Sequence, residues 1–591
     1  MCGIVGFIDK QDRLTPADKR WVISSMFKRV EHRGRDGEGI IVKGRVAMGH
    51  TRLSIIDVNA AADQPFISDD GNLSLVYNGE IYNYSELDRQ LRMKYRYQTN
   101  CDTETLLYAY NEWGIKLVEK IHGMFAFSLH DAVKDLVFFA VDRFSIKPLY
   151  YIDTDNFFAW ASEAKALLEL PDFRPTLNIG SLSEFLSFRQ FGGQETPWEE
   201  IKRMLPAQVL VYDLKRNSFE EFEYWNERQE IGGMPTSDEE IFDVLTRAVE
   251  RHLIADVPIG LQLSGGVDSS LVAAIASRIK PVQFHTFSIG LSDEAWNEFK
   301  YSRQVAVQIG SEHHEIIFDE EDFCRILPLA IYQHDEPLSH PHSVPMLILS
   351  LEARRYVKVL LSGEGADELF GGYTRYTKLF TEELDEEAWI FLNAFNQIDD
   401  LVRLFPDLNR PDLDYRRSIL DKIPVQDDVE RVLALDRRTY LQSLLIRQDK
   451  MGMAANLENR VPFLDQEVVK VALNLPSIRK VTATETKICL KKAARRVLPT
   501  EIVDRKKCGF GLPVGEWFRH PEGLGRYLKI LQSKDSLVRS LAREQVLDEM
   551  MSSHLSGTAN NTEILWVVLN LELWYRIFVL GQVPDIVWES L

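Results

Sequence analysis

The sequence of 591 residues predicts a two-domain α/β protein, with packed β-sheets first and an α/β core that carries a helical layer second. Short β-rich runs separated by turns fill the chain up to about residue 214. Helical spacing of apolar residues begins at Ser237. Between them, the polar segment 215–236 ends in glycines and a proline, as linkers do. We therefore expect domains at 2–214 and 237–591 joined by this linker.

The strand-like runs of the first part are rich in aromatic and β-branched residues. They include "GRVAMGHTRLSIID", "NLSLVYNGEIYNY", "DLVFFAVDR" and "NFFAWASE". Such runs fit pleated, half-buried surfaces, so they predict sheets that pack against one another.

The second part mixes strands with helices. Ser237 and Glu240 have the spacing of a capping box at a helix start. The runs "VQFHTFSIG" and "VKVLLSG" predict strands, and the pattern is mostly helical from about Asp427 onward.

Composition limits the partners. Lys and Arg number 69 against 89 Asp and Glu, a formal net charge of -20. This field repels polyanions, so neither nucleic acid nor an anionic membrane surface is an expected partner. No leader and no apolar run of membrane-spanning length is seen, so we expect a cytoplasmic protein.

The cysteines are five in number and scattered: Cys2, Cys101, Cys324, Cys489 and Cys508. Their odd count and wide spacing disfavour a disulfide framework and a cysteine zinc site, and they fit a reducing compartment. A cysteine at position 2 is most simply an accident of the chain start, so the rest of the sequence must decide whether Cys2 is a nucleophile.

The stretch "IGLQLSGGVDSSLVAAIASRI" predicts a phosphate loop. Ile259, Leu261 and Leu263 alternate as on a strand, a Ser-Gly-Gly turn follows, and a helix is expected from Asp268. Unpaired N–H groups at a helix N-terminus attract phosphate oxygens. Asp268 would repel phosphate unless Mg²⁺ lies between them. The common loop Gly-x-x-x-x-Gly-Lys-Ser/Thr is absent.

A second strand ends in a cluster of acids, in "VLLSGEGADELFGGYTRY". Glu364, Asp367 and Glu368 repel one another unless a cation or a substrate ammonium compensates them. A solvated acidic turn is the alternative, but the neighbouring phosphate loop favours a site.

The motifs together resemble the glutamine-dependent asparagine synthetases over nearly the entire chain. In family order they are "CGIVGF", "HRGRDGEG", "GHTRLSIID", "YNGEIYN", "DTETLL", "GMFAF", "VDRFSIKPLYY", "ASEAKAL", "SGGVDSS", "TFSIG", "SGEGADELFGGY", "NLENRVPFLD" and "DRKKCGFGLP". The resemblance implies an Ntn-type αββα sandwich of antiparallel sheets, a class II glutamine amidotransferase, at 2–214. It implies an ATP-pyrophosphatase domain, with a parallel nucleotide α hydrolase-like sheet, at 237–591. Glutamine, ATP and a carboxylate acceptor are the implied substrates and Mg²⁺ the implied metal, and we expect a homodimer.

The resemblance assigns glutamine hydrolysis to the first domain. Cys2, freed of Met1, would be the nucleophile, with its own α-amine as general base. Asn78 and Gly79 match the oxyanion donors. Arg52 matches the group that binds the substrate carboxylate, and Glu80 and Asp102 match those that bind its ammonium. Taken alone, Asn78-Gly79 predicts a hairpin turn, and both interpretations are kept.

The resemblance assigns amide synthesis to the second domain. ATP would contact Leu263, Ser264, Gly265, Gly266, Asp268, Ser269, Ile289, Ser362 and Gly363. Asp268 and Asp367 would bind Mg²⁺, Lys487 would stabilise charge at the α-phosphate, and Glu364 would assist proton removal from ammonia. A lysine on a basic helix is ordinarily solvated surface, so the role of Lys487 rests on the resemblance.

The sequence leaves two alternatives for the acceptor substrate. Arg35, Ser145 and Cys101 depart from the family pattern without touching catalysis. In "HDEPLSHPHSVPM", His340 and His342 stand where asparagine synthetases usually have small hydroxyl residues, so aspartate is favoured only narrowly over a uronic acid of a surface polysaccharide. Glu368 is the candidate partner of an acceptor ammonium.

Two rival classes share parts of this pattern. Amidotransferases that pass ammonia to a sugar phosphate lack Ser-Gly-Gly-Val-Asp-Ser, which is present here. A non-enzymatic derivative of the fold is disfavoured because both Cys2 and Asp268 are retained.

Overall fold

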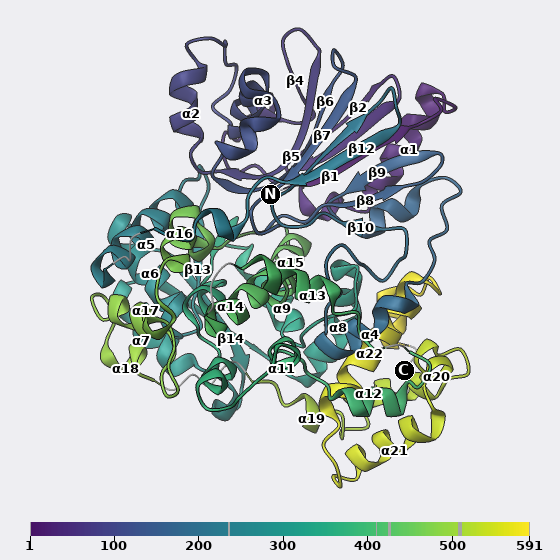
Figure 1. Ribbon diagram of the computed structural model, residues 1–591, viewed down its shortest axis with the longest axis vertical. Helices are drawn as coiled ribbons and strands as arrows, with labels where there is room; N and C mark the ends of the chain where they lie inside the picture. Colours follow the sequence, from purple (N-terminus) through teal and green to yellow (C-terminus); the bar gives the residue numbers. More distant parts are fainter. Residues whose placement is uncertain (1, 234–236, 409, 424–426, 506–510, 590–591) are drawn as a thin grey trace.

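The structure, a computed structural model, describes residues 2–233, 237–408, 410–423, 427–505 and 511–589 (Figure 1). Two antiparallel sheets of six strands each lie in the upper part of Figure 1, and a five-stranded parallel sheet lies among helices below them.

The first antiparallel sheet contains the strand that follows Cys2. In spatial order its strands are β10 (Lys202–Arg203), β8 (Tyr150–Asp153), β9 (Phe157–Ala161), β1 (Gly3–Asp9), β3 (Val46–Arg52) and β2 (Gly37–Lys43). Gly3 of β1 is opposite Thr51 of β3, so the start of β1 lies beside the end of β3.

The second antiparallel sheet faces the first. In spatial order its strands are β12 (Ser218–Glu223), β11 (Gln208–Asp213), β7 (Leu136–Val141), β6 (Gly123–Asp131), β5 (Leu73–Ile81) and β4 (Phe66–Ile67). Ile4, Met48, Val76 and Phe139 pack between the two sheets. Because side chains alternate along a strand, Val5 and Phe7 of β1 point to the other face.

Helices cover the outer faces of both sheets. They are α1 (Pro16–Lys28) on the first sheet and α2 (Tyr84–Leu91) and α3 (Asp102–Trp113) on the second. The predicted αββα sandwich of antiparallel sheets is therefore confirmed.

The third sheet is parallel throughout. Its order is β15 (Glu312–Phe318), β14 (His285–Leu291), β13 (Ile259–Gln262), β16 (Val359–Leu361) and β17 (Glu458–Arg460). From β13 the chain proceeds through β14 to β15 on one side, and β16 and β17 lie on the other. The carboxyl ends of β13 and β16 thus meet at a topological switch point, where open α/β sheets bind ligands. The predicted parallel sheet is confirmed.

Helices surround the parallel sheet and continue to the C-terminus. They are α5 (Asp238–His252), α6 (Val267–Ile279), α7 (Phe299–Ile309), α8 (Glu320–His334), α9 (Ser343–Ala353), α10 (Ala366–Phe370), α11 (Glu386–Phe391), α12 (Ile398–Leu404), α13 (Asp414–Lys422), α14 (Asp428–Arg438), α15 (Tyr440–Ala454), α16 (Gln466–Leu473), α17 (Ile488–Ala494), α18 (Thr500–Val503), α19 (Val514–Trp517), α20 (Leu537–Leu541), α21 (Glu544–Leu555), α22 (Thr562–Phe578) and α23 (Pro584–Glu589). The predicted helical layer is confirmed. Within its segment of the chain, only the short strand β17 among the described residues joins the parallel sheet.

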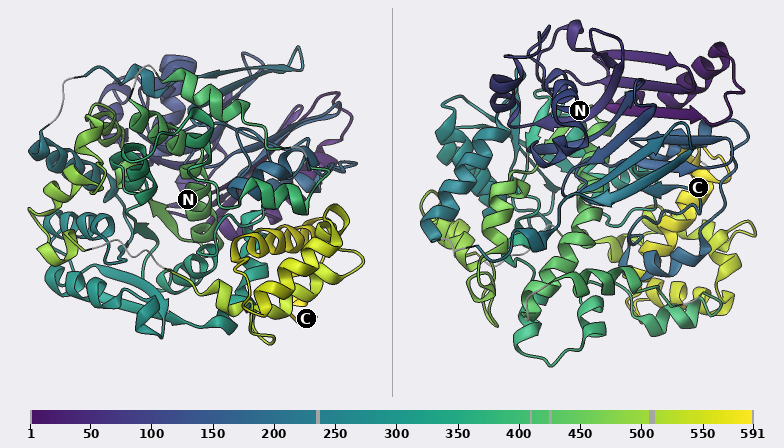
Figure 2. Two further views of the ribbon diagram at one scale, coloured as in Figure 1. Left: turned by 60° about the horizontal axis from the view of Figure 1, so that its bottom comes forward. Right: turned by 45° about the horizontal axis from the view of Figure 1, so that its top comes forward.

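The two halves share an apolar core. Helix α4 (Ile179–Phe188), which precedes β10 in the chain, lies among the C-terminal helices near α22 (Figures 1 and 2). Trp198 and Trp574 have ring centroids 5.0 Å apart across this contact. The sandwich is therefore anchored to the helical layer as well as to the parallel sheet.

Local features follow the sequence with two differences. Ser237 caps α5, as predicted, by accepting from the N–H of Glu240. Helix α6 begins at Val267, one residue before the expected start. Residues 218–223 of the predicted linker form the edge strand β12, and 234–236 lie outside the described residues. Ser145, at a position where glycine is usual in the resembled family, has φ of 49°, a backbone conformation that favours glycine.

Among the residues described, no helix combines the length and the apolar character needed to cross a membrane.

Candidate active sites

Cys2 is buried at the start of β1, with 7% of its surface exposed. Its backbone N–H donates to Asn78 Oδ1 at 2.9 Å, and its carbonyl accepts from Arg33 Nε at 3.0 Å. Burial raises the pKa of the Cys2 thiol, while the N–H of Leu53 and the charge of Arg52 act in the opposite direction. The thiol thus lies beside groups that can stabilise its ionised form.

Asn78 and Gly79 lie inside β5, opposite Ala126 and Phe125 of β6. The hairpin-turn interpretation is wrong, because nine residues of β5 continue through this pair in regular register. Since Asn78 Oδ1 accepts from Cys2, its Nδ2 points elsewhere, and within the described chain this buried donor has no hydrogen-bond partner. A Cβ on Gly79 would lie 2.2 Å from the carbonyl oxygen of Met124, so only glycine fits this close approach.

Arg52 ends β3 next to the start of β1. Its guanidinium donates to the carbonyl of Asn59 at 2.7 Å and forms an ion pair with Asp63 at 2.9 Å. It also donates to the carbonyls of Ile56 and Asp57. The loop after β3 therefore fixes the orientation of Arg52 beside Cys2.

Glu80 and Asp102 are the two acidic residues that were predicted for the same site. Burial and the charge of Glu458 raise the pKa of Glu80 well above its usual value. Burial also raises the pKa of Asp102, although its carboxylate accepts from Tyr77 at 2.8 Å and from the N–H of Ile81 at 3.0 Å. The charged forms of these two buried acids are disfavoured, and a bound ammonium group would stabilise them.

The sequence reasoning gave no role to Glu458 and Arg460, which β17 brings to this pocket. Arg460 lies 3.3 Å from Glu80 and also pairs with Glu458. Both belong to the quoted motif "NLENRVPFLD", so the motif was the available signal. The pocket around Cys2 is thus completed by a strand of the parallel sheet.

A buried ion network joins the two halves beneath Cys2. Arg33 pairs with Glu163 and with Asp449 of α15, each at 2.8 Å. Lys147 lies 3.3 Å from the other oxygen of Asp449. Desolvating such charges is costly unless each has a partner, so the network requires both halves in place. Sequence reasoning missed these residues because the pattern of each segment alone gives no sign of its partner.

The segment 264–269 is a strand-to-helix turn at the switch point. Gly265 has φ of 74°, which glycine adopts without strain. The Ser264 and Ser269 hydroxyls are 3.0 Å apart, and the N–H of Gly266 donates to Ser264 Oγ at 3.2 Å. The hydroxyls and the N-terminal turn of α6 therefore converge, as the sequence predicted.

Lys487 joins the two acidic loops. Its ammonium pairs with Asp268 of α6 and lies 2.7 Å from Asp367 of α10. Burial would lower the pKa of Lys487, but the two carboxylates outweigh it and raise that pKa above its usual value. Lys487 also has φ of 54°, a left-handed conformation that is costly for lysine and that aims this side chain at the acids. It is buried, not the solvated surface lysine that its helix suggested.

The other acids of the second loop have different partners. Glu364 pairs with Arg447 of α15 at 2.9 Å. Glu368 accepts from the Tyr373 hydroxyl at 2.6 Å, and burial followed by the charge of Asp367 raises the pKa of Glu368 to about 8. Its Oε2 has no hydrogen-bond partner among the residues described. The cluster is thus a paired, largely buried group of acids and not a solvated turn.

His340 borders this acidic pocket through aromatic rings. The ring centroids of His340 and Tyr440 are 5.6 Å apart, and those of Tyr440 and Tyr373 are also 5.6 Å apart. Burial and then the charge of Arg189 lower the pKa of His340 well below its usual value, so the ring is neutral at neutral pH. His342 has its ring centroid 6.5 Å from that of His340.

The remaining predicted nucleotide contacts surround the same switch point. Leu263 donates its N–H to the carbonyl of Phe287 at 2.8 Å, and Ile289 lies further along β14. Ser362 follows β16 and donates its N–H to the carbonyl of Arg460 at 3.0 Å, with Gly363 next to it. The motif "DRKKCGFGLP", including Cys508, lies partly outside the described residues, as does Met1.

Comparison with known proteins agrees with this arrangement. The family model described as asparagine synthase matches residues 240–576, and that of the glutamine amidotransferase domain matches residues 1–225. A putative glutamine-hydrolysing asparagine synthetase of Mycobacterium bovis is 32% identical, over 98% of this chain and 97% of its own. Asparagine synthetase 1 of Bacillus subtilis is 29% identical over the same shares. Among solved structures, glutamine phosphoribosylpyrophosphate amidotransferase from B. subtilis has 15% identity and a TM-score of 0.29, over 54% of this chain and 81% of its own.

The buried network predicts a large effect of one charge at the interface. In Asp449→Asn, Arg33 and Lys147 lose their compensating carboxylate, so we expect unfolding free energy to fall by about 3–5 kcal/mol. Urea denaturation followed by tryptophan fluorescence measures this change. The control Asp322→Asn breaks the surface pair with Arg325 and should cost less than about 1 kcal/mol. Equal effects of the two variants would contradict the importance of the network.

Proposed function

Because the chain belongs to the asparagine synthase family, we propose that it makes an amide from glutamine, ATP and a carboxylate, with aspartate as acceptor and asparagine as product. The observation that carries this proposal is the presence of two separate sites in one chain. One centres on Cys2 and the Asn78 donor that has no partner among the described residues, and the other on Lys487 between Asp268 and Asp367. The domain division at 2–214 and 237–591 is part of the proposal.

In the first site, Cys2 attacks the side-chain amide of glutamine. Asn78 Nδ2 and the Gly79 N–H donate to the developing oxyanion, which suits a buried donor that has no partner among the described residues. Asn78 Oδ1 holds the α-amine of the mature Cys2 in place while that amine takes the thiol proton. Ammonia leaves, and water then hydrolyses the γ-glutamyl thioester.

Glutamine is oriented by charge at its other end. Arg52, fixed by its loop, binds the α-carboxylate, and Glu80 with Asp102 binds the α-ammonium. The raised pKa of Glu80 supports this role, because a bound cation relieves the repulsion between buried acids.

In the second site, ATP lies at the switch point with its phosphates on residues 264–269. Asp268 and Asp367 fit Mg²⁺, since two carboxylates from neighbouring loops converge and Mg²⁺ prefers such oxygen ligands together with phosphates. When bound, Mg²⁺ would neutralise negative charge on the pyrophosphate. Lys487 then stabilises charge at the α-phosphate while the acceptor carboxylate is adenylated.

Ammonia released at Cys2 must reach the acyl-adenylate without being protonated by water. Glu364, held by Arg447, lies at the receiving end and takes a proton as ammonia attacks. The amide product, AMP and pyrophosphate leave.

The acceptor pocket favours aspartate because of Glu368. Burial and the charge of Asp367 raise the pKa of Glu368 to about 8, and the α-ammonium of aspartate would stabilise its charged form. The second candidate is a uronic acid, which His340 and Tyr440 favour because neutral ring and hydroxyl groups can hydrogen-bond sugar hydroxyls.

The first prediction for this function concerns the nucleophile. Cys2→Ala should lower glutamine hydrolysis by at least about 10⁴-fold, while amide synthesis from ammonium salt continues, since the second site needs only ammonia. Glutamate release and AMP formation measure the two reactions. Cys324→Ala, another buried cysteine, should leave both intact. Persistent glutaminase activity in protein confirmed to begin at residue 2 would refute the assignment.

The second prediction concerns the metal ligands. Asp268→Asn and Asp367→Asn keep size but remove charge, so AMP formation should fall about 10²–10³-fold with either nitrogen donor. Glutaminase activity should persist. The control Asp243→Asn changes an exposed carboxylate of α5 and should have no effect. Unchanged AMP formation in both variants would remove the basis for the metal site.

The third prediction identifies the acceptor. Mass spectrometry of products from ATP, Mg²⁺ and glutamine should find asparagine when aspartate is offered and no amide when glucuronic acid is offered. Replacing His340 and His342 together by alanine should weaken the aspartate reaction without changing glutaminase activity. Formation of glucuronamide without asparagine would show that a uronic acid, and not aspartate, is the acceptor.

The pH profile gives this prediction a second readout. Below pH 8 Glu368 retains its proton, and above it the carboxylate can pair with the ammonium of aspartate. The kcat/KM for aspartate should therefore rise as pH increases through about 8. Glu368→Gln should lower it and remove the rise, and a profile unchanged by this substitution would contradict the role of Glu368.

A further inference from the structure

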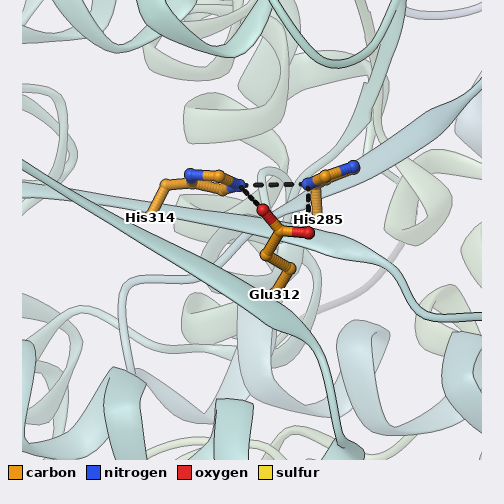
Figure 3. A group of neighbouring side chains, drawn as sticks. All are labelled: His285, Glu312 and His314. Atoms are coloured by element: carbon orange, nitrogen blue, oxygen red, sulfur yellow. Dashed lines mark hydrogen bonds and ion pairs between the residues drawn. The ribbon is translucent and has the colours of Figure 1, made fainter.

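Three metal-ligating side chains lie at the amino end of the parallel sheet, away from both sites described above. His285 begins β14 and Glu312 begins β15, and the register pairs His285 with Glu312 and Phe287 with His314. Because alternate residues share a face, His285, Glu312 and His314 project together from neighbouring strands (Figure 3).

The ligand atoms of this group face one another. His285 Nδ1 and His314 Nε2 are 3.0 Å apart. The carboxylate oxygens of Glu312 lie 3.7 Å from His285 Nδ1 and 3.8 Å from His314 Nε2, and Figure 3 shows the carboxylate between the two rings. Ligand atoms bound to one Zn²⁺ at ordinary lengths in a tetrahedron are roughly 3.3 Å apart, so these separations need only small adjustment.

Aromatic packing fixes both rings. His314 stacks on Phe287 with centroids 4.9 Å apart, and the ring of Tyr356 contacts the same imidazole at 4.2 Å. Tyr356 also lies 5.2 Å from His285. Glu312 is about half exposed, so an ion can enter from solvent. The site is therefore preorganised and accessible.

We propose that His285 Nδ1, His314 Nε2 and the carboxylate of Glu312 bind one Zn²⁺, with water at the fourth position. Two imidazoles and one carboxylate suit a borderline cation, whereas Mg²⁺ prefers oxygen ligands and near-octahedral geometry. One of the facing nitrogens carries the proton of their hydrogen bond. Zn²⁺ binding moves this proton to the other nitrogen of the same ring, which leaves both facing lone pairs for the metal.

The position of this site assigns it a structural role. Strand β14 has seven residues, so its two ends are separated by roughly 20 Å, and the phosphate loop lies at the opposite edge of the sheet. Strand β15 is at the end of the sheet and pairs only with β14 among the described strands. A metal held by one residue of β14 and two of β15 fastens this edge strand in place.

The test is Zn²⁺ titration of the full-length chain by calorimetry, in a Cys2→Ala background with millimolar Mg²⁺ present. This background removes the thiol of the first site, and Mg²⁺ competes for the carboxylates of the second. We expect one Zn²⁺ per chain, and Co²⁺ should give the visible absorption of a four-coordinate ion. Zn²⁺ should also slow amide hydrogen exchange in β15.

Two single variants and one control complete the experiment. Glu312→Gln keeps the shape of an exposed side chain, and His314→Gln removes one imidazole; each should weaken Zn²⁺ binding by about 100-fold or more. His520→Gln, which removes a surface histidine paired with Glu320, should bind Zn²⁺ as the parent does. No binding by the parent, or equal binding by parent, Glu312→Gln and His314→Gln, would overturn the proposal.

Discussion

The ion pair between Arg33 and Asp449 is the constraint that both candidate sites share. Arg33 donates to the carbonyl of Cys2 at 3.0 Å, so the pair holds the start of β1. Asp449 lies on α15, and the same helix carries Arg447, which binds Glu364 in the second site. Because separating the halves would leave Lys147 without its carboxylate partner and Arg33 with Glu163 alone, all of them buried, neither half can move independently without a large loss of free energy.

The short segment after α15 strengthens this connection. Strand β17 presents Arg460 to Glu80 in the first pocket, and the carbonyl of Arg460 accepts from the N–H of Ser362 in the second. Charge in the proposed glutamine site is therefore adjusted by a residue whose backbone supports the proposed nucleotide loop. A change in the position of β17 would alter both pockets together, which offers a physical route for coupling ammonia production to the presence of acceptor.

Local patterns predicted the fold and the loops but not the contacts between distant segments. Alternating apolar residues and the Ser-Gly-Gly turn correctly indicated a strand, a turn and a helix at the switch point, since these depend on neighbours in sequence. Arg33 and Asp449 are 416 residues apart, and no local period connects them. Asn78-Gly79 has the composition of a turn, but pairing with β6 keeps it extended. The left-handed Lys487 was equally unpredictable, because tertiary contacts with two acids hold it there.

The three acids of the second loop differ in how their charges are compensated. Like charges so close in sequence cannot all remain ionised in a buried site unless each is compensated. Glu364 has Arg447 and Asp367 has Lys487, but the Glu368 carboxylate forms no ion pair within the part of the chain described here. Burial, followed by the charge of Asp367, raises the pKa of Glu368. On the proposed function, an acceptor with an ammonium group would compensate Glu368, whereas a uronic acid, which has none, would leave Glu368 protonated, so the charges of the loop would favour aspartate.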